Sequence, residues 1–186
     1  FSNENNYMIW TFLKKCWQKG WLYRGVDVMP WCPRCATAIS QHEIVTDGYA
    51  EMTHRSVTLR FPLRGRQNES LLAWTTTPWT LPANLAVAAH PDYEYVKVRY
   101  RRIGMTDTVI IMKGLEEEIK DLGGWEKYEV LQTIQGDDLV GLEYITPFID
   151  DVPYQSQASG KWLHRVLPSK NVEASNTGLV HIAPGH

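Results

Sequence analysis

From residue 56 onwards, glycine and proline interrupt the chain at short intervals and leave only short runs rich in β-branched and aromatic residues. Runs of this length and composition are typical of strands and are too short for buried helices. Their spacing is that of an antiparallel sheet or barrel, not of alternating strands and helices. We expect strands at Ser56–Phe61, Leu71–Thr77, Asn84–His90, Tyr93–Arg101, Thr108–Lys113, Tyr128–Thr133 and Leu179–Ala183.

A helix is expected before this region, within the first 25 residues. Ile9, Phe12 and Trp17 recur there at helical spacing, with lysines between them. The predicted fold class is therefore mainly β with some α (α+β), an antiparallel β-barrel with an N-terminal helix and a few short helices. We divide the chain into a helical approach segment, 1–45, and a β-barrel domain, 46–186.

Short helical segments are expected at two places inside the barrel domain. Leu115–Leu122 is charged and stops at two glycines, and Asp137–Leu142 begins like a capped turn. The polar stretch Asp150–Lys161 is typical of a loop.

The composition limits where such a chain can work. A length of 186 residues suffices for one domain with a substantial core, and a formal net charge of −2 argues against tight stand-alone binding to nucleic acid. No apolar run approaches the roughly 20 residues of a membrane span, so we expect no membrane partner. Three cysteines do not make a disulfide framework, which fits a reducing, cytoplasmic location.

The tetrapeptide Cys32-Pro33-Arg34-Cys35 is the first candidate site. Two thiolates at this spacing can bind one tetrahedral Zn²⁺, which prefers four such ligands. A thioredoxin-like redox pair has the same spacing, but it needs a βαβ frame that these flanking residues do not show. We therefore expect half of a zinc site at Cys32 and Cys35, the alternative being a pair of inert thiols.

The run from Trp74 to Asn84, Trp-Thr-Thr-Thr-Pro-Trp-Thr-Leu-Pro-Ala-Asn, is the second candidate. Its two prolines cannot donate to a strand ladder, so the strand should leave the sheet here and expose its last hydroxyls. Hydroxyls and an amide can position a water or a carbonyl oxygen, although none of them is a strong base. The plain alternative, a β-branched strand followed by a proline-rich turn, is favoured on spacing alone.

His181 is the third candidate, in the apolar run Gly-Leu-Val-His-Ile-Ala-Pro-Gly-His from Gly178. A histidine in such a strand is more often a satisfied structural residue than a catalytic one. The basic segment 97–102 could form a phosphate-binding face, and a solvated hairpin explains it equally well.

Three of these motifs together resemble isoleucyl-tRNA synthetases. The run Thr75–Asn84 looks like their editing-site signature, and Gly178–His186 looks like their second editing motif. Cys32–Cys35 with the following Ser40–Ile44 is similar to the start of their inserted domain. The leucyl and valyl relatives carry Thr-Thr-Arg-Pro where this chain has Thr-Thr-Thr-Pro, which favours the isoleucyl family. The resemblance implies an inserted β-barrel that hydrolyses valyl-tRNA(Ile) and valyl-adenylate.

The resemblance also implies roles for individual residues. Thr76, Thr77 and His181 would be catalytic, with the two threonines orienting the ester and the water and His181 lying against the substrate. The implied substrate-binding residues are Trp74, Thr75, Thr80 and Asn84. Cys32 and Cys35 would supply half of a zinc site, whereas ATP and Mg²⁺ would belong only to the parent enzyme.

The implied partners are the 3′ acceptor end of tRNA(Ile), a valine ester or valyl-adenylate, and the remainder of the parent synthetase. The chain starts at Phe1 without an initiator methionine, so we expect a piece of a longer protein. The family's acidic substrate-gripping residue and second cysteine pair are expected outside this chain. Two alternatives stay open: the editing domain of a leucyl or valyl synthetase, and a module that docks the acceptor end without catalysis.

Overall fold

The computed structural model describes residues 2–48, 50–158 and 160–184, which fall into two compact units, Phe1–Met52 and Thr53–His186. The last two residues of the second motif, at 185 and 186, lie outside the described residues. Among the described residues, no helix combines the length and the apolar composition that a bilayer crossing requires.

The first unit carries the predicted N-terminal helix. Ser2 caps this helix by accepting a hydrogen bond from the backbone N–H of Asn5 at 3.3 Å. Its apolar residues Ile9, Phe12 and Trp17 are exposed. The elements of the unit are helix α1 (Asn3–Gln18), strands β1 (Trp31–Cys32) and β2 (Thr37–Ala38), helix α2 (Gln41–Glu43) and the π-helical turn η1 (Ile44–Gly48).

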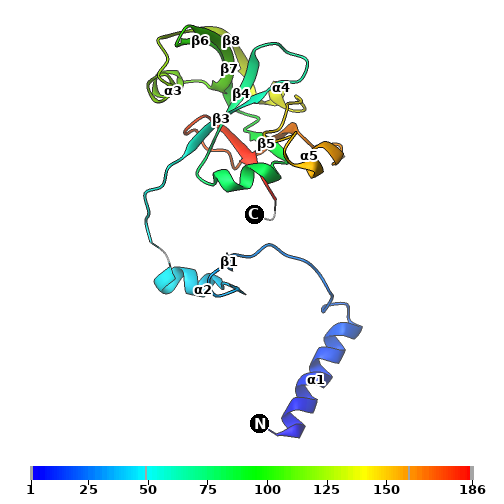
Figure 1. Ribbon diagram of the computed structural model, residues 1–186. Coiled ribbons are helices and arrows are strands. Elements are labelled where there is room, and N and C mark those ends of the chain that lie inside the picture. The colour runs from blue at the N-terminus through cyan, green and yellow to red at the C-terminus, as the bar shows by residue number, and fades with distance from the viewer. Residues whose placement is uncertain (1, 49, 159, 185–186) are drawn as a thin grey trace. The chain divides into compact units, whose positions relative to one another are not determined.

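The second unit is built around an eight-stranded sheet, which curls in Figure 1. The strand order is β8–β6–β7–β4–β10–β5–β9, and β3 also pairs with β4. The strands are β3 (Val57–Pro62), β4 (Glu69–Thr75), β5 (Ala86–Ala89), β6 (Glu94–Arg102), β7 (Met105–Met112), β8 (Lys127–Gln135), β9 (Arg165–Pro168) and β10 (Leu179–Ile182). Short helices join them: η2 (Pro78–Ala83, 3₁₀), α3 (Glu116–Gly123), α4 (Gly136–Leu139) and α5 (Pro153–Gln157).

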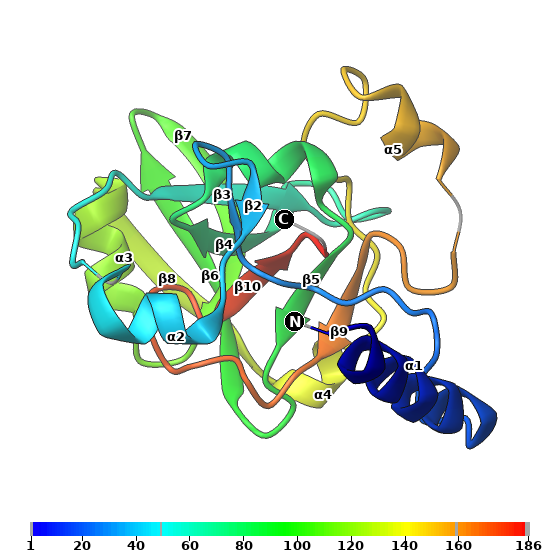
Figure 2. The same ribbon diagram turned by 90° about the horizontal axis from the view of Figure 1, so that it is seen from below.

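The second unit is mainly β structure with a few short helices, as predicted. The prediction of an antiparallel barrel is wrong. Strand β4 pairs in parallel with β7 and β10, and β5 pairs in parallel with β9. In each of these pairs the two strands lie far apart in the sequence, and β10 inserts between β4 and β5 instead of adding at an edge (Figure 2). A parallel neighbour of this kind needs a long connection, which local spacing does not reveal.

Each face of the sheet packs against its own apolar cluster. One cluster includes Leu71, Ala73 and Leu179, and the other includes Leu72 and the α3 residue Ile119. Side chains alternate between faces along a strand, so β4 places Ala73 and Leu72 on opposite sides. The same alternation decides below which residues of the second motif share a site.

Most of the predicted strands are present, but three local differences have physical causes. The strand predicted to end at Thr77 ends at Thr75, because Pro78 starts the 3₁₀ helix η2. The predicted loop at 150–161 contains α5, whose first residue is Pro153, a favoured helix start. Strand β9, at Arg165–Pro168, was not predicted because it has only four residues and ends in proline.

Candidate functional site

The threonine-rich run leaves the sheet at the end of β4 and folds back through η2. Pro78 occupies the first turn of η2, where its fixed φ fits and no N–H is needed. The backbone N–H of Thr77 donates to the hydroxyl oxygen of Thr75 at 3.1 Å, and that of Thr80 donates to the Thr77 carbonyl at 3.0 Å. These two bonds turn the chain so that three threonine hydroxyls gather at one strand end.

Strand β10 brings His181 to these hydroxyls from about a hundred residues further along the chain. It pairs with β4 in parallel at Val180 and Trp74, so the residues that follow, His181 and Thr75, share the other face. The Nε2 atom of His181 lies 2.9 Å from the Thr80 hydroxyl oxygen. The hydroxyl oxygens of Thr75 and Thr77 are 3.2 Å apart, and those of Thr77 and Thr80 are 3.4 Å apart.

Asn84 completes this group, which we call the threonine–histidine cluster: Thr75, Thr77, Thr80, Asn84 and His181. The Asn84 amide is 1% exposed, and its nitrogen donates to the Ala86 carbonyl at 3.0 Å and to Nδ1 of His181 at 2.8 Å. Its oxygen accepts from the hydroxyls of Tyr144 at 2.7 Å and Thr146 at 2.9 Å. Both donor positions and both acceptor positions are therefore occupied by the protein itself.

The contacts of Asn84 determine which nitrogen of His181 carries the proton. The Ala86 carbonyl can only accept, so the amide nitrogen of Asn84 faces it, and the same nitrogen donates to Nδ1 of His181. Nδ1 therefore has no proton, and the neutral ring carries its proton on Nε2. The Thr80 hydroxyl agrees with this tautomer, because it donates to the Thr77 carbonyl at 2.7 Å and is left to accept from Nε2.

The electrostatics of the cluster keep both aromatic donors neutral. Burial lowers the pKa of His181, which disfavours the imidazolium form. Burial also raises the pKa of Tyr144 far above its ordinary value, so its hydroxyl remains a donor to Asn84 at every physiological pH. A neutral imidazole with both nitrogens engaged is neither an available general acid nor an available base.

Exposure shows which groups a ligand can reach. Thr75 and Thr80 are buried, Thr77 is partly exposed, and Thr76 is exposed. The reachable hydroxyl of the cluster is thus that of Thr77, and no hydrogen bond joins Thr76 to the cluster among the described residues. The Thr77 hydroxyl can hold a carbonyl oxygen or a water molecule, while the half-buried His181 ring forms a wall of the same cluster.

Trp74 is not brought together with the cluster. Its side chain lines a groove of about 680 Å³ on the opposite face of the sheet, together with Arg60 and Arg102. The wall of this groove includes Tyr100, whose ring stacks on Trp125 with centroids 4.4 Å apart. Strand alternation separates Trp74 from Thr75 in this way.

The cysteine pair lies in the β1–β2 hairpin, where Cys32 ends β1 and Cys35 lies in the turn that follows. The backbone N–H of Cys35 donates to the Cys32 sulfur at 3.4 Å, and this bond lowers the pKa of Cys32. A side-chain hydrogen bond from the Cys35 thiol to the Cys32 sulfur raises the pKa of Cys35. Within the described ranges, no three histidine, cysteine or acidic side chains group closely enough to hold a metal, so the thiols stand as a pair.

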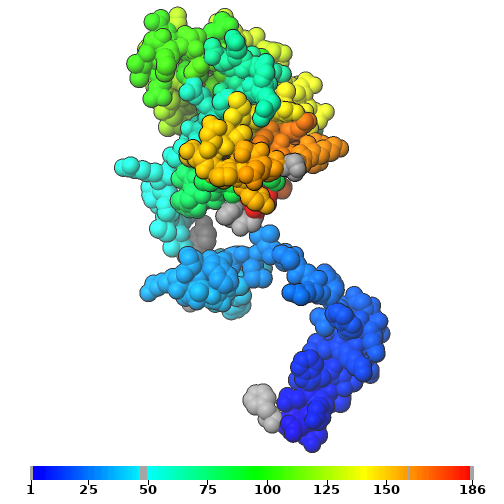
Figure 3. All heavy atoms as spheres, turned by 45° about the vertical axis from the view of Figure 1, so that its right-hand side comes forward, coloured from blue at the N-terminus to red at the C-terminus, as the bar shows by residue number. Residues whose placement is uncertain are grey.

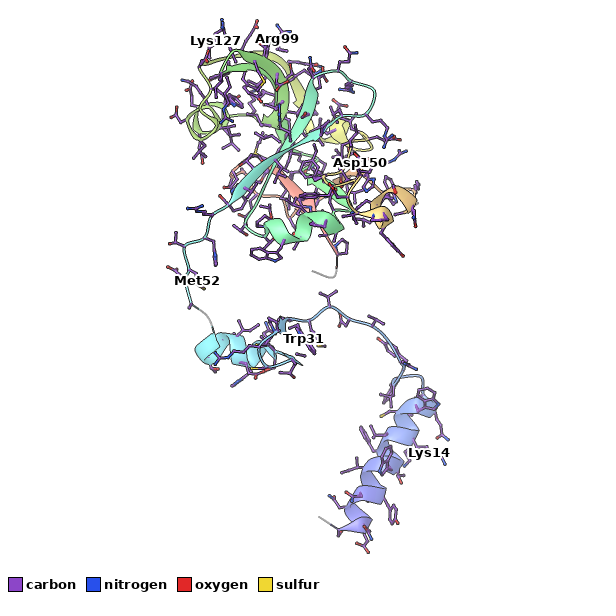
Figure 4. All side chains as sticks on the ribbon, in the orientation of Figure 1. Lys14, Trp31, Met52, Arg99, Lys127 and Asp150 are labelled. Carbon is purple, nitrogen blue, oxygen red and sulfur yellow. The ribbon has the colours of Figure 1, made fainter. Side chains whose placement is uncertain are left out.

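The basic segment 97–102 is largely neutralised by neighbouring carboxylates. Lys97 pairs with Glu69 at 2.8 Å, and Arg99 pairs with Glu129 at 3.5 Å. Arg99 of β6 lies with Lys127 of β8 at one end of the second unit (Figure 4). The arrangement fits the solvated hairpin better than a phosphate-binding face.

Sequence reasoning missed the residues behind the cluster. Tyr144 and Thr146 hold Asn84, and Gln155 and His164 bond to each other at 2.7 Å nearby. For Tyr144 and Thr146, the only signal in the sequence is their alternation with Leu142. The alternation indicates that the three side chains share a face, but it does not indicate that this face contacts Asn84.

Comparison with known proteins gives consistent matches along the chain. Residues 2–178 match the family model of class I tRNA synthetases (I, L, M and V). An isoleucine–tRNA ligase of Pyrococcus furiosus is 45% identical over 99% of this chain, and one of Methanoculleus marisnigri is 43% identical over 95%. The chain covers only 17% and 16% of those two relatives.

Solved structures share the fold at low sequence identity. A crystal structure described as GlLeuRS-CP1 matches with a TM-score of 0.54 and 17% identity, covering 70% of this chain and 55% of that one. The cytosolic leucyl-tRNA synthetase editing domain of P. knowlesi matches with a TM-score of 0.51 and 16% identity, covering 68% and 55%.

Proposed function

We propose that this chain, which belongs to the class I tRNA synthetases (I, L, M and V), is the hydrolytic editing domain of an isoleucyl-tRNA synthetase. The named relatives support the isoleucyl assignment, since they are isoleucine–tRNA ligases at 45% and 43% identity. The observation that carries the proposal is the threonine–histidine cluster. The reachable Thr77 hydroxyl lies there with a fixed, neutral imidazole wall, which suits hydrolysis of an ester by positioned water.

The proposed substrates are valyl-tRNA(Ile) and valyl-adenylate. A synthetic pocket gains too little from one methylene to reject valine adequately, a limit for which the isoleucyl enzyme is itself the standard illustration. A second, smaller pocket solves this problem, because it admits valine and excludes isoleucine. The proposed partners are therefore the 3′ acceptor end of tRNA(Ile) and the remainder of the synthetase, where ATP and Mg²⁺ act.

In the proposed reaction, water adds to the ester carbonyl carbon and the bond to the ribose oxygen breaks. The proton of the water ends on that ribose oxygen. Thr77 and Thr76 hold the carbonyl oxygen and the water in line, so that catalysis rests on orientation and hydrogen bonding rather than on a strong base. No covalent bond to the protein forms.

His181 limits the size of the substrate side chain in this proposal. Its two nitrogens are already bonded to Thr80 and Asn84, so the ring offers mainly carbon atoms to a ligand. Its orientation is fixed from both ends, which gives the pocket a rigid wall. A rigid wall discriminates by shape, and the extra methylene of isoleucine meets it.

The variant Thr77→Ala tests catalysis against simple docking. We expect its kcat for valyl-tRNA(Ile) to fall about 100- to 1,000-fold, since one positioning donor lost from a reaction centre costs about that much. Thr77→Ser keeps the hydroxyl and should retain most of the activity. Equal hydrolysis by Thr77→Ala and the unmodified chain would leave only a docking role for this site.

The exposed apolar face of α1 supports the synthetase as a partner. Ile9, Phe12 and Trp17 are exposed in the described first unit, and burying three such side chains stabilises an interface by several kcal/mol, at roughly 1.5–3 kcal/mol each. A contact with the remainder of the synthetase would cover them. The free cysteines fit the cytoplasm, where glutathione and thioredoxin keep thiols reduced.

For the cysteine pair, we propose that Cys32 and Cys35 donate two thiolates to a zinc ion whose other ligands come from the rest of the synthetase. The lowered pKa of Cys32 supports this role, because zinc binds thiolates. The ion would have a structural role, because it would hold the β1–β2 hairpin to the part of the synthetase that supplies the other ligands.

Cobalt binding to the full synthetase that contains this chain tests the zinc proposal. Co²⁺ replaces zinc at thiolate sites and gives a sulfur-to-metal absorption band. We expect this band with the unmodified synthetase and with its Cys16→Ser variant, and a much weaker band with Cys35→Ser. A band that depends equally on Cys16 and Cys35 would contradict the proposed pair.

A further inference from the structure

Helix α5 (Pro153–Gln157) is attached to the second unit in an unusual way. Gln155, 9% exposed, is its only buried side chain, and the adjacent Tyr154 is 81% exposed. The helix lies on the surface in the gold and orange region of Figure 3. No apolar side chain of α5 enters a core, so the amide of Gln155 carries the attachment.

Gln155 forms hydrogen bonds to the backbone of the proposed editing site. Its amide nitrogen donates to the carbonyls of Pro82 at 2.7 Å and of Asn84 at 3.1 Å. Pro82 is the penultimate residue of η2, and Asn84 is the residue whose side chain holds His181. Carbonyls at a helix end lack helical partners, so these bonds define where the end of η2 lies.

His164 fixes the orientation of the Gln155 amide. Both backbone carbonyls can only accept, so the amide nitrogen faces them and its oxygen faces His164. That oxygen accepts from Nε2 of His164 at 2.7 Å. The backbone N–H of His164 also donates to the Leu85 carbonyl at 2.8 Å, which ties the same histidine to the residue after Asn84.

We propose that Gln155 is a positioning residue of the editing site, which places Asn84, and through it His181, by holding the two carbonyls at the end of η2. This inference rests on the proposed function for its effect on hydrolysis. The effect of Gln155 on the position of the η2 backbone does not depend on the proposed function. Residues from α5 thus belong to the site although none of them touches the substrate.

The test compares Gln155→Glu and Gln155→Ala with Gln157→Ala, a change at an exposed glutamine of the same helix. Glutamate has the same shape as glutamine but turns a carboxylate oxygen toward the two carbonyls. A residue that only fills space would tolerate glutamate better than alanine. A positioning residue gives the reverse order, with glutamate the more damaging.

Two readouts separate this inference from the proposed function. We expect Gln155→Glu to lower kcat for valyl-tRNA(Ile) about tenfold or more with little change in KM, Gln155→Ala to lower it less, and Gln157→Ala to leave it unchanged. We also expect faster hydrogen exchange at the backbone amides of Thr80 and Asn84 in both Gln155 variants.

The exchange readout decides the inference even if the chain hydrolyses no ester. Faster exchange confined to these amides supports the positioning role, and exchange equal to that of Gln157→Ala overturns it. Should Gln155→Glu fail to fold, Gln155→Ala, which introduces no charge, is judged by the same two amides.

Discussion

Replacing His181 with alanine is expected to abolish much of the discrimination between valyl-tRNA(Ile) and isoleucyl-tRNA(Ile). The ring is held between Thr80 and Asn84, so its removal opens space that neighbouring side chains do not fill. One methylene in an apolar pocket is worth roughly 10- to 200-fold in specificity, and we expect the ratio of kcat/KM for the two esters to fall by about that factor. Hydrolysis of the isoleucyl ester should rise while that of the valyl ester falls.

The matched control for this change is His54→Ala, at an exposed histidine of the same unit. It should leave both esters hydrolysed as before. The comparison uses initial rates of deacylation for both esters with both variants. An unchanged ratio in His181→Ala would remove His181 from the size limit and leave it a structural residue.

Changing Asn84 to aspartate is expected to place a proton on Nδ1 of His181 and to favour the imidazolium form of the ring. The amide nitrogen that donates to Nδ1 becomes an oxygen that can only accept, so the ring must carry a proton on Nδ1. A carboxylate beside the ring also favours the charged form, and we expect the pKa of His181 to rise from its lowered position. The new carboxylate oxygen also faces the Ala86 carbonyl, which destabilises the fold by about 1–3 kcal/mol.

Nitrogen chemical shifts of the ring measure this change directly. The unmodified chain should show the tautomer protonated on Nε2 and little imidazolium near pH 6.5, whereas Asn84→Asp should show a titration displaced to higher pH. Deacylation should fall at least about tenfold, because the wall is no longer fixed in its neutral form. Asn171→Asp, at an exposed asparagine, provides the control. A ring protonated on Nδ1 in the unmodified chain would contradict the account of the cluster.

Local pattern predicted much of the fold but not its topology. Strands such as Val57–Pro62 and Glu94–Arg102 have enough alternation and length to be seen in the sequence. The mixed pairing could not be predicted, because it depends on strands far apart in the sequence: β4 pairs with β7 and β10, and β5 pairs with β9. Pairing of this kind is decided by long-range packing, which spacing between neighbouring runs does not encode.

For the site, residue chemistry and family resemblance suggested candidate residues, and the structure shows which of them lie together. Thr77, Thr80 and His181 are brought together, whereas Trp74 lies on the other face, as strand alternation alone would have required. The support of Asn84 was not predictable, because Tyr144 stands 60 residues away in sequence. From the sequence alone, the amide of Asn84 is a candidate substrate ligand, and only the structure shows the four protein groups that it bonds to.

The deacylation of valyl-tRNA(Ile) and isoleucyl-tRNA(Ile) by this chain tests the central claim most directly. Both esters are presented at equal concentration, and release of the amino acid is followed over time with chain and without it. The account predicts catalysed release of valine and release of isoleucine close to the uncatalysed rate. A folded chain that accelerates neither reaction, or both equally, would contradict it.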